Sequence, residues 1–324
     1  MTMTEPPTYA GVDYERGTEE TPADYPTIED KLRRGLEVTA TALETYHNPA
    51  IMWTGGKDST LALYLVKELC DDLGFDLPPA IFIDHFQHFD TVHAFVERWS
   101  DRWSVDLVYA RNEDIGRMVD RHGLEPGDQI NVEDLGEVNR HHIEHLLEYD
   151  DATFPFLLDT YVGNHLLKTV ALNETLESKK FDAIISGVRW DEQEARAEET
   201  FFSPRHDPDI YPPHDRVHPI LQFTERDVWD ATWEYMVPEV VDGYPEGASR
   251  PTSTDDLPEG IDPDDLPISP KYFDGFRSLG SEVSTKRTSD QPAWMQDLEG
   301  STERAGRAQD KEDLMKRLRE LGYM

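Results

Sequence analysis

The sequence predicts an α/β protein with a doubly wound, mostly parallel sheet of five strands, followed by an irregular and helical C-terminal extension. Short apolar runs, such as residues 80–83 and 181–185, alternate with longer segments whose apolar residues recur at helical spacing. Two of the runs end in turns that contain glycine, at residues 54–56 and 186–187. In parallel sheets of this class, ligands bind where the strands end.

The N-terminal part supplies the first elements. Residues 1–26 combine prolines with acidic residues and contain too little apolar surface to fold alone, so we expect an acidic flexible tail, mobile or loosely docked. Thr27 and Asp30 form a helix start signal ahead of a helix that reaches Tyr46. The apolar run at Ile51 then predicts a strand, and an apolar-periodic helix follows the glycines.

The rest of the sheet domain, which we place at residues 27–242, continues the alternation. We expect strands at residues 80–83, 105–110, 181–185 and 217–221, and helices at residues 91–103, at residues 157–177 and from Thr224 onward.

A polar insertion at residues 112–153 interrupts the alternation and should contain a helix at residues 138–148. In that helix His141 and His145 are spaced to hold a divalent ion, with His142 between them. No third ligand is evident, however, and histidines on a solvated polar helix are the commoner case.

The C-terminal part divides into two segments. Residues 243–270 are rich in proline, glycine, serine and aspartate, which predicts a linker loop. Residues 271–324 form the extension and end in a helix that reaches Tyr323. In this extension Arg304 and Arg307 flank a glycine and could hold a phosphate, unless they form a basic helix start docked against an acidic body.

Composition limits the function classes. The chain has 67 acidic against 31 basic residues and a formal net charge of −36. Such a surface repels nucleic acid and anionic membranes, so we expect neither as a partner. Because the acidic residues are spread along the whole chain, they indicate a halophilic protein from a high-salt cytoplasm. An acidic protein of an ordinary mesophile is the alternative.

Cys70 is the sole cysteine, which excludes an intramolecular disulfide and any CxxC redox or zinc motif. The sequence contains no run of about 18 apolar residues, and no signal leader opens it. We therefore expect a soluble, cytoplasmic protein.

The residues 54–59, Thr-Gly-Gly-Lys-Asp-Ser, predict a phosphate-binding loop between a strand and a helix. Gly55 and Gly56 let the backbone approach a pyrophosphate and adopt positive φ angles. Lys57 adds charge, and Ser59 adds a hydroxyl donor. The spacing fits neither the Walker A pattern nor GxGxxG. A glycine turn without a ligand is the alternative.

A second group of functional candidates follows the strand at residues 181–185. Arg189, Arg196 and Arg205 lie close together in an otherwise acidic chain, and a guanidinium suits planar oxyanions because its fork donates two hydrogen bonds. The alternative is that each arginine forms a local surface ion pair with a neighbouring acid, such as Asp191 or Glu192.

These blocks resemble a known superfamily. The loop at residues 54–59 is similar to the SGGxDS motif of the PP-loop ATP pyrophosphatases, with Thr54 in place of the first serine. With the block from Arg189 to Arg205 and the tail at residues 302–307, it resembles the PAPS reductase-like superfamily, which has the adenine nucleotide alpha hydrolase-like fold. Within it, the chain most resembles the small, adenylyltransferase subunit of the two-subunit sulfate adenylyltransferase, in a haloarchaeal-type version. The sulfonucleotide reductases need a C-terminal cysteine, which this chain lacks, so we do not expect cysteine-dependent PAPS reduction.

The resemblance implies an enzyme that transfers the adenylyl group of ATP to sulfate and releases pyrophosphate. Lys57, Arg189 and Arg196 would be the catalytic residues. The nucleotide would be held by Thr54, Gly55, Gly56, Lys57, Asp58, Ser59, Asp84 and Gly187, and Asp58 would orient the loop or a Mg²⁺ ion. The substrates would be bound by Arg189, Asp191, Glu192, Arg196, Arg205, Arg304 and Arg307.

The resemblance also implies a GTPase partner subunit that drives the uphill reaction, and a homo-oligomer is possible. Two other readings stay open. The chain could adenylate another acceptor, such as a tRNA base for thiolation or flavin mononucleotide. It could also be a nucleotide-binding protein that has lost catalysis.

Overall fold

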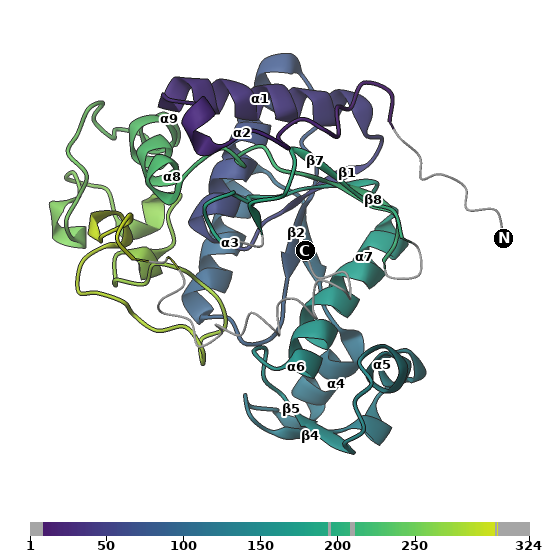
Figure 1. Ribbon diagram of the computed structural model, residues 1–324. Helices are drawn as coiled ribbons and strands as arrows, with labels where there is room; N and C mark the ends of the chain where they lie inside the picture. Colours follow the sequence, from purple (N-terminus) through teal and green to yellow (C-terminus); the bar gives the residue numbers. More distant parts are fainter. Residues whose placement is uncertain (1–8, 194–195, 208–210, 302, 304–324) are drawn as a thin grey trace.

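The computed structural model describes residues 9–193, 196–207, 211–301 and 303, and its centre is a six-stranded sheet in the order β3-β2-β1-β6-β8-β7 (Figure 1). The strands are β1 (Pro49–Met52), β2 (Ala80–Ile83), β3 (Leu107–Ala110), β6 (Ala183–Ile185), β7 (Phe202–Arg205) and β8 (His214–Val217). All neighbours pair in parallel except β7, which runs antiparallel to β8. The predicted doubly wound α/β fold is confirmed, with six strands in place of five.

The additional strand is β7, at the edge of the sheet. Its Pro204 has no amide hydrogen, and a proline is tolerated in an edge strand because one side of that strand has no partner to bond. The predicted fifth strand also shifts, since β8 begins at His214 and ends at Val217 instead of spanning residues 217–221. The two strands pair with Phe202 opposite Val217 and Arg205 opposite His214.

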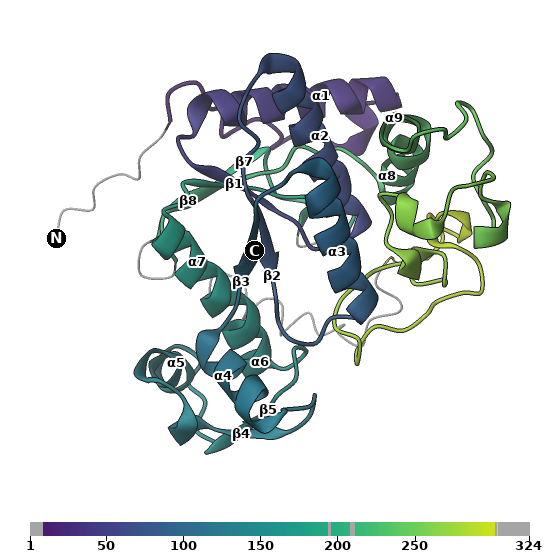
Figure 2. The ribbon, with the colours of Figure 1, turned by 180° about the vertical axis from the view of Figure 1, so that it is seen from behind.

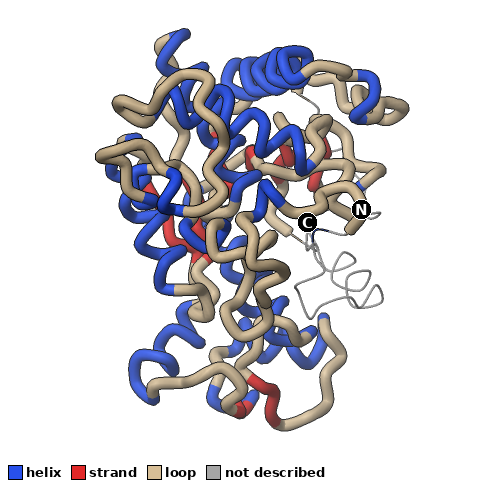
Figure 3. The backbone as a smooth tube through the Cα atoms, turned by 90° about the vertical axis from the view of Figure 1, so that its left-hand side faces the viewer, coloured by secondary structure: helices blue, strands red, loops and turns tan. Residues whose placement is uncertain are grey.

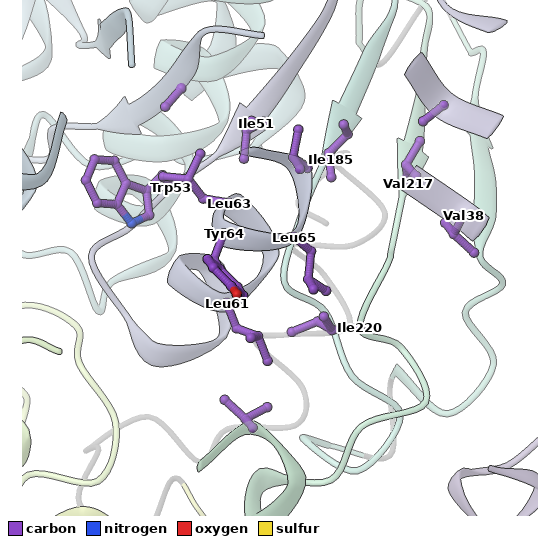
Figure 4. Packing of buried hydrophobic residues seen from close by; sticks show 14 of the residues in the cluster. Val38, Ile51, Trp53, Leu61, Leu63, Tyr64, Leu65, Ile185, Val217 and Ile220 are labelled. Atoms are coloured by element: carbon purple, nitrogen blue, oxygen red, sulfur yellow. The ribbon is translucent and has the colours of Figure 1, made fainter. Parts of the chain in front are cut away.

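Helices cover both faces of the sheet (Figures 1 and 2). α1 (Ile28–Thr45), α2 (Lys57–Leu73) and α3 (Asp90–Trp103) pack on one face, and α7 (Ala171–Lys179) packs on the other. The alternation along β1 divides the two cores. Ile51 points into the larger core with Leu65 of α2, whereas Met52 lies with Leu172 of α7. Figure 4 shows the larger core around α2, with Val38 of α1 and Ile185 of β6.

The helix starts follow from local chemistry. The Thr27 hydroxyl accepts a hydrogen bond from the Asp30 amide at the start of α1, as its sequence predicts. Thr224 and Asp227 form a reciprocal capping box at the start of α8 (Glu225–Ala231). Gly74 ends α2 in the left-handed conformation, with φ of 73°.

The insertion after β3 forms a small subdomain, which lies at the bottom of Figure 1. It contains α4 (Glu113–His122), α5 (Glu137–His141), a π-helical turn (His142–Leu146) and a two-stranded sheet of β4 (Gln129–Asn131) and β5 (Thr153–Pro155). Its own core includes Ile115 and Phe154. α6 (Tyr161–Asn164) and a π-helical segment (His165–Val170) then join it to α7 in the main sheet.

The first and last described segments pack on the sheet domain. In the N-terminal segment, the Tyr14 hydroxyl donates a hydrogen bond of 2.7 Å to Asp215, and Tyr25 is buried. The C-terminal segment packs on α8, a π-helical turn (Thr232–Met236) and α9 (Val237–Val240), where Trp229 and Trp294 share a third core with Tyr272. This packing brings Tyr272 to the start of α2.

Short 3₁₀ turns supply much of the remaining structure, and long loops join them (Figure 3). The 3₁₀ turns are Pro22–Asp24, Val132–Asp134, Thr254–Asp256, Pro263–Asp265, Pro270–Tyr272 and Ala293–Met295. The predicted linker at residues 243–270 includes Leu266 and Ile268, which are buried in the third core. No helix in the described part of the chain is both long and apolar enough to cross a membrane.

Candidate functional site

A cleft of about 260 Å³ opens at the carboxyl edge of the sheet, beside the ends of β1 and β6. The strand order reverses here, because β2 and β3 lie on one side of β1 and β6, β8 and β7 lie on the other. Crevices at such a reversal of strand order are where doubly wound sheets bind ligands. The loop at residues 54–59 and the turn at residues 186–187 both contribute to the lining, as their positions at strand ends predict.

The glycine loop has the form of a helix-terminal anion site. Gly55 has φ of 73°, and a Cβ at this position would lie 3.0 Å from a methyl group of Val96, so a larger residue does not fit. Gly56 has φ of −81° and caps α2, so the positive φ expected for both glycines occurs at Gly55 alone. The Ser59 hydroxyl lies 3.1 Å from the Thr54 amide and closes the turn.

Gly187 fixes the loop from the opposite side. A Cβ on Gly187 would lie 2.6 Å from the carbonyl carbon of Asp58, a distance that no side chain tolerates. The end of β6 therefore lies directly against the first turn of α2. This close contact explains why a glycine ends the strand at residues 183–185.

Lys57 and Arg189 meet beside the loop, although 131 residues separate Arg189 from the adjacent Asp58. The carboxylate of Glu303 bridges the two cations, at 2.6 Å from Lys57 Nζ and 2.7 Å from an Nη atom of Arg189. Burial lowers the pKa of Lys57, but neighbouring carboxylates, led by Asp58 and Glu303, outweigh burial and raise it. Both cations are therefore charged, and an anion already lies between them.

A second oxygen reaches the same helix start. The Tyr272 hydroxyl accepts a hydrogen bond of 2.9 Å from the Lys57 amide, which helix geometry leaves without a partner inside α2. Burial raises the pKa of Tyr272, so its oxygen is a neutral hydroxyl. Glu303 and Tyr272 together place oxygen atoms where a phosphate group would accept hydrogen bonds.

Asp58 and Asp191 hold the cations in position. The Asp58 carboxylate contacts Lys57 Nζ at 3.0 Å and pairs with Arg189. Asp191 contacts Arg189 Nε at 2.8 Å and accepts a hydrogen bond from the Glu225 amide. Within the described residues, no group of three or more histidine, cysteine or acidic side chains is arranged to hold a metal ion.

Of the predicted arginines, Arg196 and Arg205 line the cleft, whereas Arg189 is fully buried beside it. Arg196 forms an ion pair of 2.6 Å with Glu192, four residues earlier, so the local pair given as the alternative is present. Arg205 contacts Glu199 at 3.0 Å and lies against Ser203. Since both arginines are largely buried and line the cleft, they are not ordinary surface ion pairs. Arg304 and Arg307 lie outside the described residues.

On the β2 side, the wall consists of histidines. Asp84 does not line the cleft, because its carboxylate accepts hydrogen bonds from the Phe86 amide at 3.0 Å and from Arg111 at 2.8 Å. His85 and His88 line it instead, with rings stacked 3.6 Å apart. Burial lowers the pKa of His88 to about 4, so the ring is neutral near pH 7. His141, His142 and His145 lie in the distant subdomain, where His142 contacts His165 at 2.8 Å.

Several lining residues were not predicted from the sequence, among them Lys168, Glu199, Arg216, His218, Tyr272 and Glu303. One of them had a local signal. Arg216 is a charged residue inside a strand whose neighbour Val217 is apolar and buried, which is unusual in a sheet interior. Glu303 lies in the tail at residues 302–307 that carries part of the resemblance, but no role was assigned to it. The contacts of Tyr272 and Glu303 with Lys57 leave no local pattern, because they join segments 215 and 246 residues apart.

The assembled cleft has three parts with different chemistry. Neutral histidines and apolar side chains lie at the end of β2, the anion-binding loop lies at the end of β1, and arginines lie at the ends of β8 and β7. Cys70 lies in α2, does not line the cleft and is 2% exposed. Burial raises its pKa to about 11, so the thiolate that redox chemistry needs is disfavoured.

Comparison with known proteins identifies relatives of the chain. Residues 137–240 match the family described as phosphoadenosine phosphosulfate reductase domain. The chain is 26% identical to sulfate adenylyltransferase subunit 2 of Rhizobium meliloti (strain 1021), across 76% of this chain and 78% of that protein. The protein of the same name from Brucella ovis is 25% identical, across 86% of this chain and 92% of its own length. The predicted resemblance is confirmed.

The fold has a counterpart among solved structures. The crystal structure of Candida glabrata FMN adenylyltransferase matches with a TM-score of 0.50 at 16% identity, and the match covers 90% of this chain and 94% of that one. At this identity the match bears on the fold alone, which it supports.

Proposed function

We propose that this chain, as a relative of proteins named sulfate adenylyltransferase subunit 2, is a nucleotidyltransferase that forms adenosine 5′-phosphosulfate and pyrophosphate from ATP and sulfate. The observation that carries the proposal is the pairing, in one cleft, of an anion-binding glycine loop with arginines on the neighbouring strands. The reaction needs both parts, because a triphosphate and a second oxyanion must bind side by side.

The loop side binds the leaving group. Backbone amides at the start of α2 and the Lys57 ammonium donate hydrogen bonds to the β- and γ-phosphates of ATP, and Gly55 lets the backbone approach them. Arg189 neutralises the charge that develops on pyrophosphate as it leaves. Phosphoryl-type transfers depend on this kind of positioning and charge stabilisation more than on covalent help from the protein.

The arginine side binds the acceptor. A sulfate oxygen attacks the α-phosphorus, the bond from that phosphorus to the bridging oxygen breaks, and its electron pair leaves with pyrophosphate. Arg196 and Arg205 hold the sulfate and the α-phosphate in line for this displacement. No proton is transferred, so the neutral His85 and His88 are free to border the nucleoside.

The cysteine chemistry of a reductase does not fit this cleft. A sulfonucleotide reductase needs a thiolate at the bound substrate, and Cys70 is buried in α2 outside the lining. The match of residues 137–240 to the reductase domain therefore reflects shared ancestry in nucleotide binding, not a shared reaction.

The cofactors and partners follow from the reaction. ATP is the nucleotide, and Mg²⁺ accompanies its phosphates. Because the product anhydride is higher in energy than ATP, we include a GTPase partner subunit that drives the reaction, in keeping with relatives named as one subunit of an enzyme. Assembly into a homo-oligomer and residence in a high-salt cytoplasm belong to the same proposal.

The test is release of pyrophosphate from Mg-ATP at molar KCl, measured with and without sulfate and with and without a candidate GTPase partner. Stimulation by sulfate is the expected result. Stimulation by flavin mononucleotide or by tRNA in place of sulfate would show another acceptor. ATP binding without any turnover in the presence of the partner would show a protein that has lost catalysis.

A further inference from the structure

Among the described residues, one arginine of the cleft wall has no carboxylate partner. Arg216 of β8 is 8% exposed and lines the cleft, yet no carboxylate oxygen of the described residues lies within 4.0 Å of its guanidinium nitrogens. The two other arginines that line the described cleft wall have such partners, since Arg196 pairs with Glu192 and Arg205 pairs with Glu199. Arg189, which is fully buried beside the loop, pairs with Asp58. A buried, unpaired charge is costly unless a ligand completes it.

Within the described part of the chain, the side-chain hydrogen bond of Arg216 goes to a neutral group. Its Nε donates to His214 Nε2 at 2.9 Å, and His214 Nδ1 lies 2.7 Å from the carbonyl oxygen of Pro212. The ring therefore carries its proton on Nδ1, and burial together with Arg216 lowers the pKa of His214 to about 3. His214 orients the guanidinium without neutralising it, and the Nη groups stay available for a ligand.

Strand register brings further donors beside Arg216. Ser203 of β7 and Ile184 of β6 are its partners in the sheet, so the three side chains form one row on the same face. Arg205 pairs with His214 one step along the same face. The opposite face of β7 and β8 carries Phe202 and Val217 and is packed in the larger core. The strands β7 and β8 thus present their apolar face to the larger core and their cationic face to the cleft.

A histidine closes this corner of the cleft. His218 follows β8 on the same alternation as His214 and Arg216, and its Nδ1 lies 3.0 Å from the Ser186 hydroxyl. Its Nε2 is buried and has no hydrogen-bond partner, and the nearest carboxylate, that of Glu199, lies 3.7 Å away. Because Glu199 is already bound by Arg205, the group formed by Arg205, Arg216, His218 and Glu199 has more hydrogen-bond donors than acceptors.

We propose that Arg216, with Arg205 and Ser203 beside it, forms the subsite that binds the tetrahedral oxyanion acceptor, sulfate, and that Arg189 serves the pyrophosphate side instead. The inference rests on the proposed function and refines it. Sulfate carries two negative charges and only accepts hydrogen bonds, which matches a pocket of guanidinium and hydroxyl donors. The position of β8 beyond β6 places this subsite across the cleft from the wall of His85 and His88.

The test compares Arg216→Gln with Arg226→Gln, an exposed arginine that pairs with Glu299 on the surface. Sulfate-dependent pyrophosphate release and ATP binding are measured in KCl at constant ionic strength. We expect Arg216→Gln to raise the KM for sulfate at least tenfold while the Kd for ATP changes less than twofold. A tenfold weaker ATP affinity with an unchanged KM for sulfate, or no change in either, would overturn the assignment.

Two additions keep the test decisive. Arg216→Lys retains the buried charge but loses the planar guanidinium, so this variant should fold and should still raise the KM for sulfate severalfold. An unchanged KM for sulfate in this variant would count against the subsite. Calorimetric titration with potassium sulfate separates the subsite from the reaction. If wild type binds sulfate without turnover and Arg216→Gln does not bind it, the proposed function fails and the subsite stands. Equal binding by both proteins, or none by wild type, overturns the subsite.

Discussion

Replacing Glu303 by glutamine should tighten ATP binding. The Glu303 carboxylate bridges Lys57 and Arg189 at 2.6 and 2.7 Å, which are the cations that the phosphates of ATP must reach. The nucleotide therefore binds only when this carboxylate has moved away. Because the Glu303 carboxylate competes with the phosphates, the apparent Kd for ATP equals the Kd of the open site divided by the fraction of molecules in which the site is open.

The size of the effect follows from the two contacts. Hydrogen bonds to charged groups are each worth about 1.5–3 kcal/mol. Displaced Glu303 regains water, and glutamine still accepts one neutral hydrogen bond, so only part of this energy is released by the substitution. A net gain of about 1.4–2.8 kcal/mol corresponds to an ATP Kd about 10- to 100-fold lower. The same change leaves two buried cations with one carboxylate fewer, so the ligand-free protein should also unfold at a lower temperature.

The measurement is calorimetric titration with a non-hydrolysable ATP analogue at molar KCl. Glu299→Gln is the matched control, because that glutamate belongs to the same segment but is exposed and pairs with Arg226. We expect the control to bind as wild type does. An unchanged or weaker affinity in Glu303→Gln would refute the reasoning, since it would mean that the carboxylate does not compete with the phosphates.

Four further results are expected. Lys57→Ala should lower the kcat of pyrophosphate release at least tenfold, and Cys70→Ser should leave this kcat unchanged. Full activity of the Lys57→Ala variant, or loss of activity in the Cys70→Ser variant, would contradict the assignment of the site. Gly187→Ala should weaken ATP binding at least tenfold, because its Cβ would lie 2.6 Å from the backbone of Asp58, and normal binding would show that the loop can move. Burial lowers the pKa of His165 to about 3 in the folded protein, whereas a histidine in the unfolded chain titrates near its usual 6.5. Below pH 6.5 the unfolded chain therefore binds a proton at this residue that the folded chain does not bind, and the free energy of unfolding falls. That single group accounts for about 2 kcal/mol between pH 8 and pH 5, and an unaltered pH slope of the unfolding free energy in His165→Gln would disprove it. The melting temperature should rise between about 0.1 and 1 M KCl as screening weakens the self-repulsion of a chain with net charge −36, and a flat response would count against a high-salt origin.

The sheet and the glycine loop could be predicted because their signals are local. An apolar run followed by Gly55 and Gly56 and an amphipathic helix determines strand, turn and helix within a few residues of each other. The turn at Gly187 was found for the same reason. Even here one detail needed the structure, because Gly56 caps the helix with ordinary extended geometry, and sequence alone does not separate its role from that of Gly55.

The remainder of the site depends on contacts that leave no local pattern. β7 is short, polar and contains Pro204, so nothing in its own residues predicts a strand, and only its pairing with β8 stabilises it. Tyr272 and Glu303 come from the C-terminal extension, which follows the predicted linker and lies outside the predicted sheet domain. They reach Lys57 only because the tryptophan-rich core beneath α8 and α9 holds that segment against the start of α2.

The ion pairs at the cleft also suggest how a strongly acidic chain could bind anions. In the proposed reaction a chain with net charge −36 binds a triphosphate and a second anion, so the cleft would need more positive charge than the surface around it. If its cations were unpaired at rest, they would repel one another and lose much of their hydration on burial. Instead each of Lys57, Arg189 and Arg205 has a carboxylate, and a substrate anion can replace that carboxylate without a change in the number of charge contacts. Binding then becomes an exchange of anions in which the displaced glutamate gains water. Arg216 differs, since no carboxylate of the described residues pairs with it. In the proposed subsite, the acceptor would therefore bind at Arg216 without first displacing a described side chain.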